Sequence, residues 1–176
     1  MLGFYYKPPL ALPLMRLTIW GDKLLLLDWF DDKTNQLSTK LHKSITFMPI
    51  DEMNGNDQKF ARFIMQELDA YFNGTLYRFS IPLDVSHGTD FQVKVWQMLM
   101  NITYGETISY KELATQIGNP NAFRACANAN GKNPISLIVP CHRVIASDGS
   151  IGGYTGGIGI KETLLNFEKQ YNIKCK

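Results

Sequence analysis

The segment ISYKELATQIGNPNAFRACANANG, residues 108–131, decides how the fold of this chain is interpreted. A first helix is expected to begin at Ser109, because an N-cap Ser followed three residues later by Glu112 forms a capping box. Gly118 suits the position just after that helix, and the Asn-Pro pair at 119–120 starts another, with Asn as N-cap and Pro in the first turn. Two short helices joined by a Gly-Asn turn predict a helix-turn-helix, although ordinary helical hairpins share this spacing.

The second helix of this pair is notable for the size of its side chains. Small residues recur along one helical face and polar residues share another. A small-residue face allows close approach to another backbone, and one cation with several amides suits phosphates or base edges. A helix packed on a protein neighbour, with a solvated arginine, fits the same spacing. The small face comprises Ala122, Ala125, Cys126 and Ala129, and the polar face Asn121, Arg124 and Asn128.

A cysteine and a histidine stand side by side in VPCHRVIASDG, residues 139–149. The β-branched run at 135–140 predicts a buried strand that delivers Cys141 to its end. Adjacent residues on a strand point to opposite faces, so the pair is either a coincidence or part of a bent backbone that controls the thiol. A thiol with an ordinary pKa of about 8.5 is mostly protonated at neutral pH, and its activation requires a base with an orienting partner.

His142 is the candidate base, and its opposing direction predicts contact with Cys141 through a water. A final helix expected over 160–171 can supply the orienting carboxylate, since Glu168 lies on the same stripe as Leu164 and Glu162 does not. A surface charge on a helix is the competing interpretation of Glu168. Under the base hypothesis, Glu168→Gln is expected to leave folding nearly intact while slowing the reaction of the thiol.

Metal binding and nucleotide binding are the other uses that this region suggests. Cys141 and His142, with Cys126 fifteen residues back and Cys175 near the end, match no known zinc-ligand spacing. We therefore expect no metal site, a structural role for Cys126 and a frayed terminal thiol at Cys175. The glycine-rich segment 149–159 is not a dinucleotide-binding fingerprint. It is either a surface linker or a flexible loop that presents Tyr154 and Thr155 to a flat, mostly apolar guest.

The first half of the chain carries strands and one helix but no chemical motif. Segments 14–20 and 23–30, joined by Gly-Asp, predict a hairpin. Further strands are expected around 44–48 and over 76–85, and a helix over 60–72. We divide the chain into an α+β scaffold domain at 1–85 and a mainly helical domain at 86–176.

Composition sets the broad class of the protein. Hydrophobic residues make up 45% of the 176 residues and charged residues 19%, which is typical of a globular chain. Residues 1–88 carry nine Lys/Arg against ten Asp/Glu, and residues 89–176 nine against six, which weakly favours the second half as the face toward a polyanion. Three cysteines, no basic leader and no long apolar run predict a soluble, cytoplasmic protein outside the membrane.

The segments 133–157 and 108–131, with the terminal KETLLNFE, closely resemble the O6-alkylguanine-DNA alkyltransferases, also called methylated-DNA–protein-cysteine methyltransferases. The resemblance runs from about Phe91 to Glu168 and is loose before about residue 85. It implies a small, strand-rich, RNase H-like N-terminal domain and a helical C-terminal domain with a winged-helix-like helix-turn-helix. It also implies DNA repair by a single, irreversible transfer of an alkyl group from O6-alkylguanine, and O4-alkylthymine as a further possible substrate.

The resemblance also implies roles for particular residues. Cys141 would accept the alkyl group, His142 held by Glu168 would take its proton, Asn133 would brace the turn before the active-site segment, and Tyr110 would donate to the leaving guanine. Duplex DNA would bind through its minor groove, with the base flipped, to a monomer that needs no cofactor and lacks the zinc of some relatives. The DNA- and substrate-binding residues would be Arg124 as the finger that enters the duplex, Tyr154 and Thr155 over the base, Val144 in the pocket, Ser147 near the backbone, and Asn119 and Lys111.

Two other functions compete with this interpretation. An alkyltransferase-like protein binds lesions without accepting the alkyl group, but such proteins lack the acceptor cysteine that Cys141 supplies here. A thiol hydrolase could also use a Cys-His pair, but no oxyanion-hole arrangement is evident in the sequence.

Overall fold

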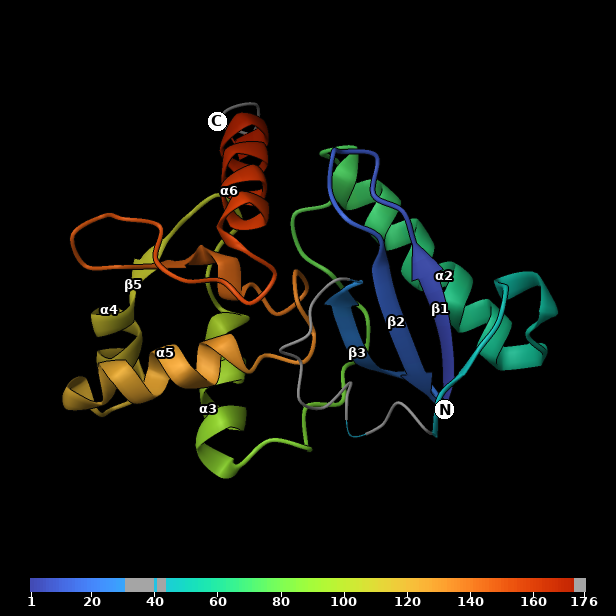
Figure 1. Cartoon of the computed structure of the whole chain (residues 1–176), viewed down its shortest axis with the longest axis horizontal. Helices are drawn as coiled ribbons and strands as arrows, with labels where there is room; N and C mark the ends of the chain where they lie inside the picture. The colour runs from blue at the N-terminus through green and yellow to red at the C-terminus, as the bar shows by residue number, and fades with distance from the viewer. Residues whose placement is uncertain (31–39, 41–43, 173–176) are drawn as a thin grey trace. The chain divides into compact units, whose positions relative to one another are not determined.

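The computed structural model describes residues 1–30, 40 and 44–172. His42 and Cys175 lie outside these residues, so the expectations for them have no structural counterpart. The chain divides into two compact units, Met1–Asp84 and Val85–Lys176, one residue from the boundary expected at 85/86 (Figure 1). No helix in the described part of the chain is both long enough and apolar enough to cross a membrane.

Unit 1 is built on a four-stranded sheet in the order β3-β2-β1-β4. The strands are β1 (Leu2–Tyr6), β2 (Met15–Trp20), β3 (Lys23–Trp29) and β4 (Thr46–Phe47). Strands β2 and β3 form the predicted hairpin, whose turn places Gly21 at a φ of 59°, a left-handed conformation that glycine adopts without strain. Strand β4 is shorter than expected and pairs parallel with β1.

The helix of unit 1 packs on this sheet through its apolar face. After the turn η2 (Ile50–Glu52), helix α2 (Gly55–Phe72) begins five residues before the expected start at 60 and ends where predicted. It buries Ala61, Ile64, Leu68, Tyr71 and Phe72. The Tyr6 hydroxyl of β1 donates to Asp69 Oδ1 at 2.9 Å, and its ring stacks on that of Phe72, which fixes α2 against β1.

The expected strand at 76–85 is wrong. Its backbone makes one isolated bridge, Leu83 with Leu24. Pro82 has no N–H to donate to a ladder, and the Ser80 N–H donates instead to Glu67 Oε2 at 2.8 Å. The segment is therefore a connection pinned at Leu24, not a further strand of the sheet.

Unit 2 contains the predicted helix-turn-helix. Helix α4 (Tyr110–Gln116) begins with the expected capping box, in which Ser109 accepts from the Glu112 N–H and the Glu112 side chain accepts from the Ser109 N–H. Gly118 follows with a φ of 80°, as predicted for a residue just past the helix. The Asn119 side chain makes no capping hydrogen bond, and the short turn η3 (Pro120–Ala122) leads into helix α5 (Phe123–Gly131).

Two further helices complete unit 2 around this pair. Helix α3 (Asp90–Leu99) begins after the N-cap Thr89, and helix α6 (Ile158–Asn172) matches the predicted final helix (Figure 1). The Trp96 indole N–H of α3 donates to the Ala129 carbonyl of α5 at 2.8 Å in the core. Strands β5 (Ile108–Ser109) and β6 (Val144–Ile145) pair in parallel and thereby join the start of α4 to the Cys-His segment.

The predicted strand at 135–140 is also wrong. These residues are buried but form consecutive turns, with Leu137 at a φ of 73° and hydrogen bonds from the Val139 N–H to the Ile135 carbonyl and from the Cys141 N–H to the Val139 carbonyl. The β-branched side chains report burial, and that signal does not separate a strand from a buried turn. The turns lead into the 3₁₀ helix η4 (Cys141–Arg143), so the bent backbone considered for the Cys-His pair is what the chain adopts.

Candidate active site

The Cys141 thiol lies at the start of η4 and is 2% exposed. The Asn133 amide sits against it and holds the bend: its Nδ2 donates to the Val139 carbonyl at 2.8 Å and lies 3.1 Å from Cys141 Sγ. Its Oδ1 accepts from the Ile135 N–H at 3.0 Å. Asn133 thus takes the place that strand neighbours would have filled.

Opposing effects act on the Cys141 thiol. Burial raises its pKa, because the low-dielectric interior disfavours the thiolate. The Asn133 amide, the Lys161 ammonium and a hydrogen bond from Tyr154 each act in the opposite direction. The resting group is therefore a thiol surrounded by donors that stabilise the thiolate once a proton acceptor removes the proton.

Lys161 is a buried cation in this region that the sequence interpretation missed. Its side chain is fully buried, and Nζ donates to the Val144 carbonyl at 2.6 Å and to the Gly153 carbonyl at 3.4 Å. Burial lowers its pKa to about 8, whereas the attraction of a Cys141 thiolate raises it. A signal was present in the sequence, since Lys161 lies on the α6 stripe of Leu164 and Glu168 at spacings of three and seven residues.

Tyr110, the first residue of α4, lies beside the same two groups. Lys161 Nζ is 6.0 Å from the centre of its ring. Burial and the charge of a Cys141 thiolate raise the pKa of the phenol, and a hydrogen bond with Asn130 lowers it. Tyr110 is therefore a protonated phenol at neutral pH, capable of donating to an oxygen or nitrogen placed near Cys141.

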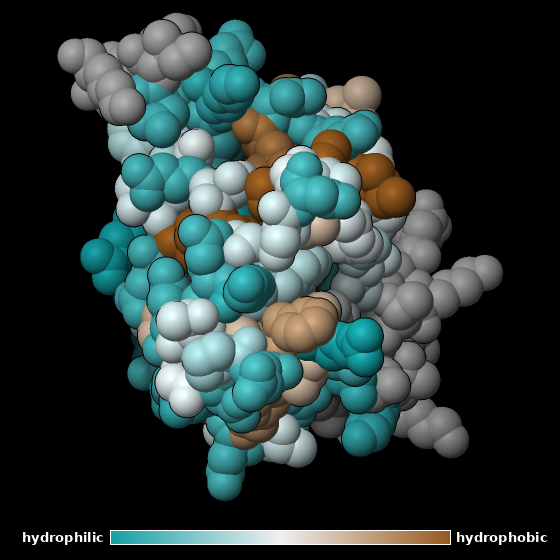
Figure 2. All heavy atoms as spheres, turned by 90° about the vertical axis from the view of Figure 1, so that its left-hand side faces the viewer, coloured by the Kyte–Doolittle hydropathy of each residue, from teal (hydrophilic) through white to brown (hydrophobic). Residues whose placement is uncertain are grey.

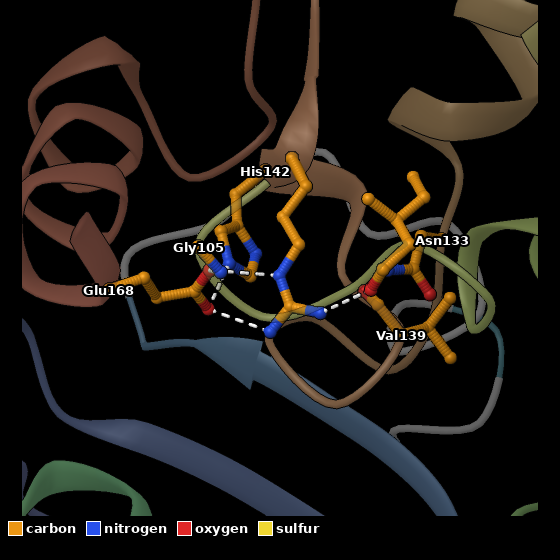
Figure 3. A network of polar contacts seen from close by, with 7 residues as sticks. Gly105, Asn133, Val139, His142 and Glu168 are labelled. Carbon is orange, nitrogen blue, oxygen red and sulfur yellow. Dashed lines mark hydrogen bonds and ion pairs between the residues drawn. The ribbon is translucent and has the colours of Figure 1, made fainter. Parts of the chain in front are cut away.

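Glu168 is fully buried on α6 and organises the other side of the Cys-His segment (Figure 3). Its Oε1 is 2.9 Å from His142 Nε2 and accepts from Arg143 Nη2 at 2.8 Å. Its Oε2 accepts from Arg143 Nε at 2.8 Å and from the Gly105 N–H at 3.1 Å. The His142 imidazole and the Arg143 guanidinium hold the Glu168 pKa far below its usual range. The alternative of a surface charge is excluded for Glu168.

His142 is neutral and has a defined tautomer. Burial lowers its pKa, and Glu168 opposes that effect only in part. An ionised carboxylate can only accept, so Nε2 must carry the proton that is shared with Glu168 Oε1. Nδ1, which is buried and has no hydrogen-bond partner among the described residues, then carries a lone pair and can accept a proton.

Arg143 is the second residue that the sequence interpretation missed. Its side chain is buried, donates twice to Glu168 and donates from Nη1 to the Ile102 carbonyl at 2.7 Å. It neutralises Glu168 so that the carboxylate remains ionised in the interior. Its position beside His142 was visible in the sequence, but a partner 25 residues away was not.

The remaining predicted residues fall into two groups. Val144 is buried, and Tyr154 and Thr155 are half-buried on the loop before α6, where Thr155 Oγ1 donates to the Gly131 carbonyl at 2.7 Å. The residues expected to contact DNA, namely Arg124, Asn119, Lys111 and Ser147, are exposed. The structure therefore brings Cys141, His142, Glu168 and Asn133 together in the interior, with the half-buried Tyr110 beside Lys161, and leaves the DNA-binding candidates at the surface.

The small-residue face of α5 is only partly a packing face. Cys126 and Ala129 are buried, whereas Ala125 is exposed together with the polar side chains of Asn121, Arg124 and Asn128. Among the described residues, no group of three or more His, Cys, Asp or Glu side chains is placed to hold a metal ion.

Both halves of the chain match family models. Residues 11–85 match the ribonuclease-like domain of 6-O-methylguanine DNA methyltransferase, and residues 90–170 match its DNA-binding domain. The chain belongs to the 6-O-methylguanine DNA methyltransferase family. The match confirms the resemblance read from the sequence and the expected α+β fold, including the ribonuclease-like N-terminal part that the sequence resembled only loosely.

Similar proteins of this family carry related names. The chain is 51% identical over 113 residues to the methylated-DNA–protein-cysteine methyltransferase of Methanosarcina barkeri, covering 64% of this chain and 71% of that protein. It is 56% identical over 110 residues to the one of Mycobacterium leprae, covering 62% and 66%. The crystal structure of Mycobacterium tuberculosis OGT in complex with DNA superimposes with a TM-score of 0.82 at 38% identity, covering 97% of this chain and 94% of that one.

Proposed function

We propose that this protein repairs DNA by moving the methyl group of O6-methylguanine from duplex DNA onto its own Cys141. Its membership of the 6-O-methylguanine DNA methyltransferase family, and relatives named methylated-DNA–protein-cysteine methyltransferase, support the activity. The observation that carries the assignment is the chain of contacts around one thiol. A neutral imidazole is held by a buried carboxylate, and three groups that favour the thiolate surround Cys141.

The transfer is a displacement at a saturated carbon. The bond from Cys141 Sγ to the methyl carbon forms as the bond from that carbon to guanine O6 breaks. The thiol proton passes through a water to His142 Nδ1, and the Tyr110 phenol donates a proton to the departing guanine. The His142 imidazolium then gives up its proton, through solvent, to the Tyr110 phenolate, which restores both groups. Over the whole reaction the thiol proton is exchanged for the methyl group, yielding guanine and S-methylcysteine. Since no group in the site removes a methyl from a thioether, each protein molecule reacts once.

The target base has to leave the helix to reach this thiol. The alkylated oxygen lies inside the base stack, and Cys141 is 2% exposed, so the nucleotide rotates out at a cost of a few kcal/mol. Tyr154 and Thr155 would cover the rotated base and Val144 would line its pocket. On the surface, Arg124 would enter the duplex from the minor groove, while Asn119, Lys111 and Ser147 would contact its backbone.

The same proposal covers the oligomeric state of the protein, its need for a cofactor and its cellular compartment. It acts as a monomer without a cofactor, because the thiol, base and proton donor all come from one unit of one chain. A thiol nucleophile must stay reduced, which fits the cytoplasm. O4-alkylthymine remains the second substrate class to test, since it presents an alkylated exocyclic oxygen on a smaller ring. An alkyltransferase-like protein without transfer is disfavoured, because Cys141 is present and set among groups that stabilise its thiolate.

A titration with excess lesion tests the proposal. Duplex DNA containing O6-methylguanine is added in increasing amounts to a fixed amount of protein, and the restored guanine is measured by nucleoside chromatography. We expect one guanine per protein molecule and then no further reaction, with none formed by Cys141→Ser. Continued turnover would reject the single transfer, and no guanine from the wild-type protein would reject the function.

A further inference from the structure

An exposed aromatic ring stands beside the arginine proposed to enter the duplex. Phe123 is the first residue of α5, and its side chain is 44% exposed. The Arg124 guanidinium lies over this ring, 5.6 Å from its centre, a cation–π distance. The two side chains therefore leave the same end of α5 as one unit, with part of the ring surface open to solvent.

Phe123 has only small neighbours on its own helix. The side chains three and four positions on, which share its face of α5, are those of Cys126 and Ala127. Figure 2 shows that the side of the molecule it presents is mostly hydrophilic, with a few separate apolar side chains. A single exposed phenylalanine is common on protein surfaces, so the case for a ligand rests on its pairing with Arg124 and on the charge of this stretch.

The charge around the pair selects the kind of ligand. No Asp or Glu occurs between Glu112 and Asp148, and within that stretch Arg124 and Lys132 are exposed cations. A planar apolar ring next to a guanidinium, in a stretch free of carboxylates, suits a partner that is both anionic and made of flat rings. Nucleic acid has both properties, since its phosphates carry the charge and its bases offer π-faces.

We propose that Phe123 is a second wedge, whose ring stacks on a base left without its neighbour when the target nucleotide rotates out. This inference rests on the proposed function, and it adds a residue to the duplex-opening element. Apolar side chains such as Phe inserted between base steps unstack them and hold the duplex bent. Arg124 fills the space of the departed nucleotide, and Phe123 covers the π-face beside it, so that the two share the work of keeping the duplex open.

Comparing three substrates tests this role. Wild type and Phe123→Ala are reacted with O6-methylguanine in duplex DNA, with the same lesion in single-stranded DNA, and with free O6-benzylguanine. We expect the rate on the duplex to fall about fivefold or more, since base–aromatic stacking has a measurable effect in alanine substitutions. The single strand and the free base have no stack to open, so their rates should fall far less. Trp20→Ala, which removes an exposed aromatic ring from unit 1, is the matched control and should leave all three rates unchanged.

Two further readouts separate a wedge from a support for Arg124. If the ring itself contacts a base, Phe123→Ala still slows duplex repair in an Arg124→Ala background. Because the ring carries no charge, Phe123→Ala should leave the salt dependence of duplex binding unchanged. Arg124→Ala, which removes a charge, should make that dependence shallower. A loss that disappears in the Arg124→Ala background, or equal losses on all three substrates, would overturn the proposal. Wild-type protein that transfers nothing from the duplex would instead mean that the proposed function has failed.

Discussion

Among the described residues, each unit of the molecule buries one carboxylate against an arginine, and the two networks differ in what else they hold. In unit 1, Asp28 on β3 faces Arg16 on the adjacent strand β2 and accepts from it at 3.0 and 2.8 Å. In unit 2, Glu168 accepts twice from Arg143, and also binds His142 and the Gly105 N–H. Arg16 keeps 19% of its side chain exposed, whereas Arg143 keeps 8%.

The difference separates a structural ion pair from a reactive one. Asp28 and Arg16 join the neighbouring strands β2 and β3. The Glu168 network includes an imidazole whose second nitrogen lacks a hydrogen-bond partner among the described residues, and the residue just before it in the chain carries the buried thiol. A buried charge alone therefore does not identify an active site. The combination of buried charge with an unsatisfied titratable atom is what supports the site proposed in unit 2.

The largest expected effect is on stability, and it sets the two networks against each other. Glu168→Gln leaves the Arg143 guanidinium buried without a counter-charge, and we expect it to lower the free energy of unfolding by about 3–5 kcal/mol. Asp28→Asn should cost less, about 1–3 kcal/mol, because the partly exposed Arg16 can turn toward water. Urea unfolding of each variant, followed by hydrogen exchange of the backbone amides in each unit, measures both losses in the free energy of unfolding. Equal losses in the two variants would remove the distinction between the networks.

Acid should weaken the Glu168 network in a defined range of pH. The pKa of Glu168 is lower in the folded protein than in the unfolded chain, so its contribution is present above the unfolded value of about 4.3 and is lost as the pH falls below it. The fluorescence of Trp96, in a variant that carries Phe at 20 and 29, follows the unfolding of unit 2 by urea at each pH. We expect a fall in stability below about pH 4 that Glu168→Gln does not show. The same slope in both proteins would mean that other carboxylates control acid unfolding.

A smaller effect is expected from the second buried cation of unit 2. Lys161→Met removes the positive charge that favours the Cys141 thiolate, so the pKa of that thiol should rise further. Alkylation of Cys141 by iodoacetamide at neutral pH should slow roughly tenfold or more, as Coulomb's law gives at an effective dielectric constant of about 20. The difference in alkylation rate between the wild-type protein and Lys161→Met should also shrink as the pH rises past the Lys161 pKa of about 8. Lys169→Met, an exposed change on the same helix, is the control, and an equal slowing in both variants would exclude a local effect.

The smallest effect is expected in the loop before α6. Thr155→Ala removes the hydrogen bond to the Gly131 carbonyl, which should lower the free energy of unfolding of unit 2 by about 0.5–1.5 kcal/mol. Thr163→Ala removes a bond of similar length to the Gly159 carbonyl within α6, where it is exposed, and should cost less. Thermal unfolding of the two variants compares them. A larger loss in Thr163→Ala would show that the Thr155 bond does not fasten the loop.

Local signals in the sequence were sufficient for the helices of unit 2. The capping box at Ser109 and the glycine at 118 after α4 depend on residues at most a few positions apart, so the pattern contains all the information that is needed. The pairing of His142 with Glu168 was one of two interpretations of a carboxylate on the apolar stripe of the final helix, and it was the one that the family resemblance implied.

Contacts between distant residues explain what the sequence did not reveal. Segment 135–140 looks like a strand because its side chains are buried, but the Asn133 amide satisfies its backbone in place of a neighbouring strand. Arg143 and Lys161 read as ordinary surface cations until the fold brings them against Glu168 and the Val144 carbonyl. For the same reason the expectation that Glu168→Gln would leave folding nearly intact no longer stands, since it took no account of Arg143.

The central claim is that the Cys141 sulfur accepts the methyl group, and mass spectrometry of the intact protein tests it most directly. After incubation with duplex DNA containing O6-methylguanine, the protein should gain the mass of one methyl group in place of one proton. Fragmentation should locate that group on Cys141, and Cys141→Ser should gain nothing. An unchanged mass in the wild-type protein, or a methyl group found on Cys126, would contradict the account.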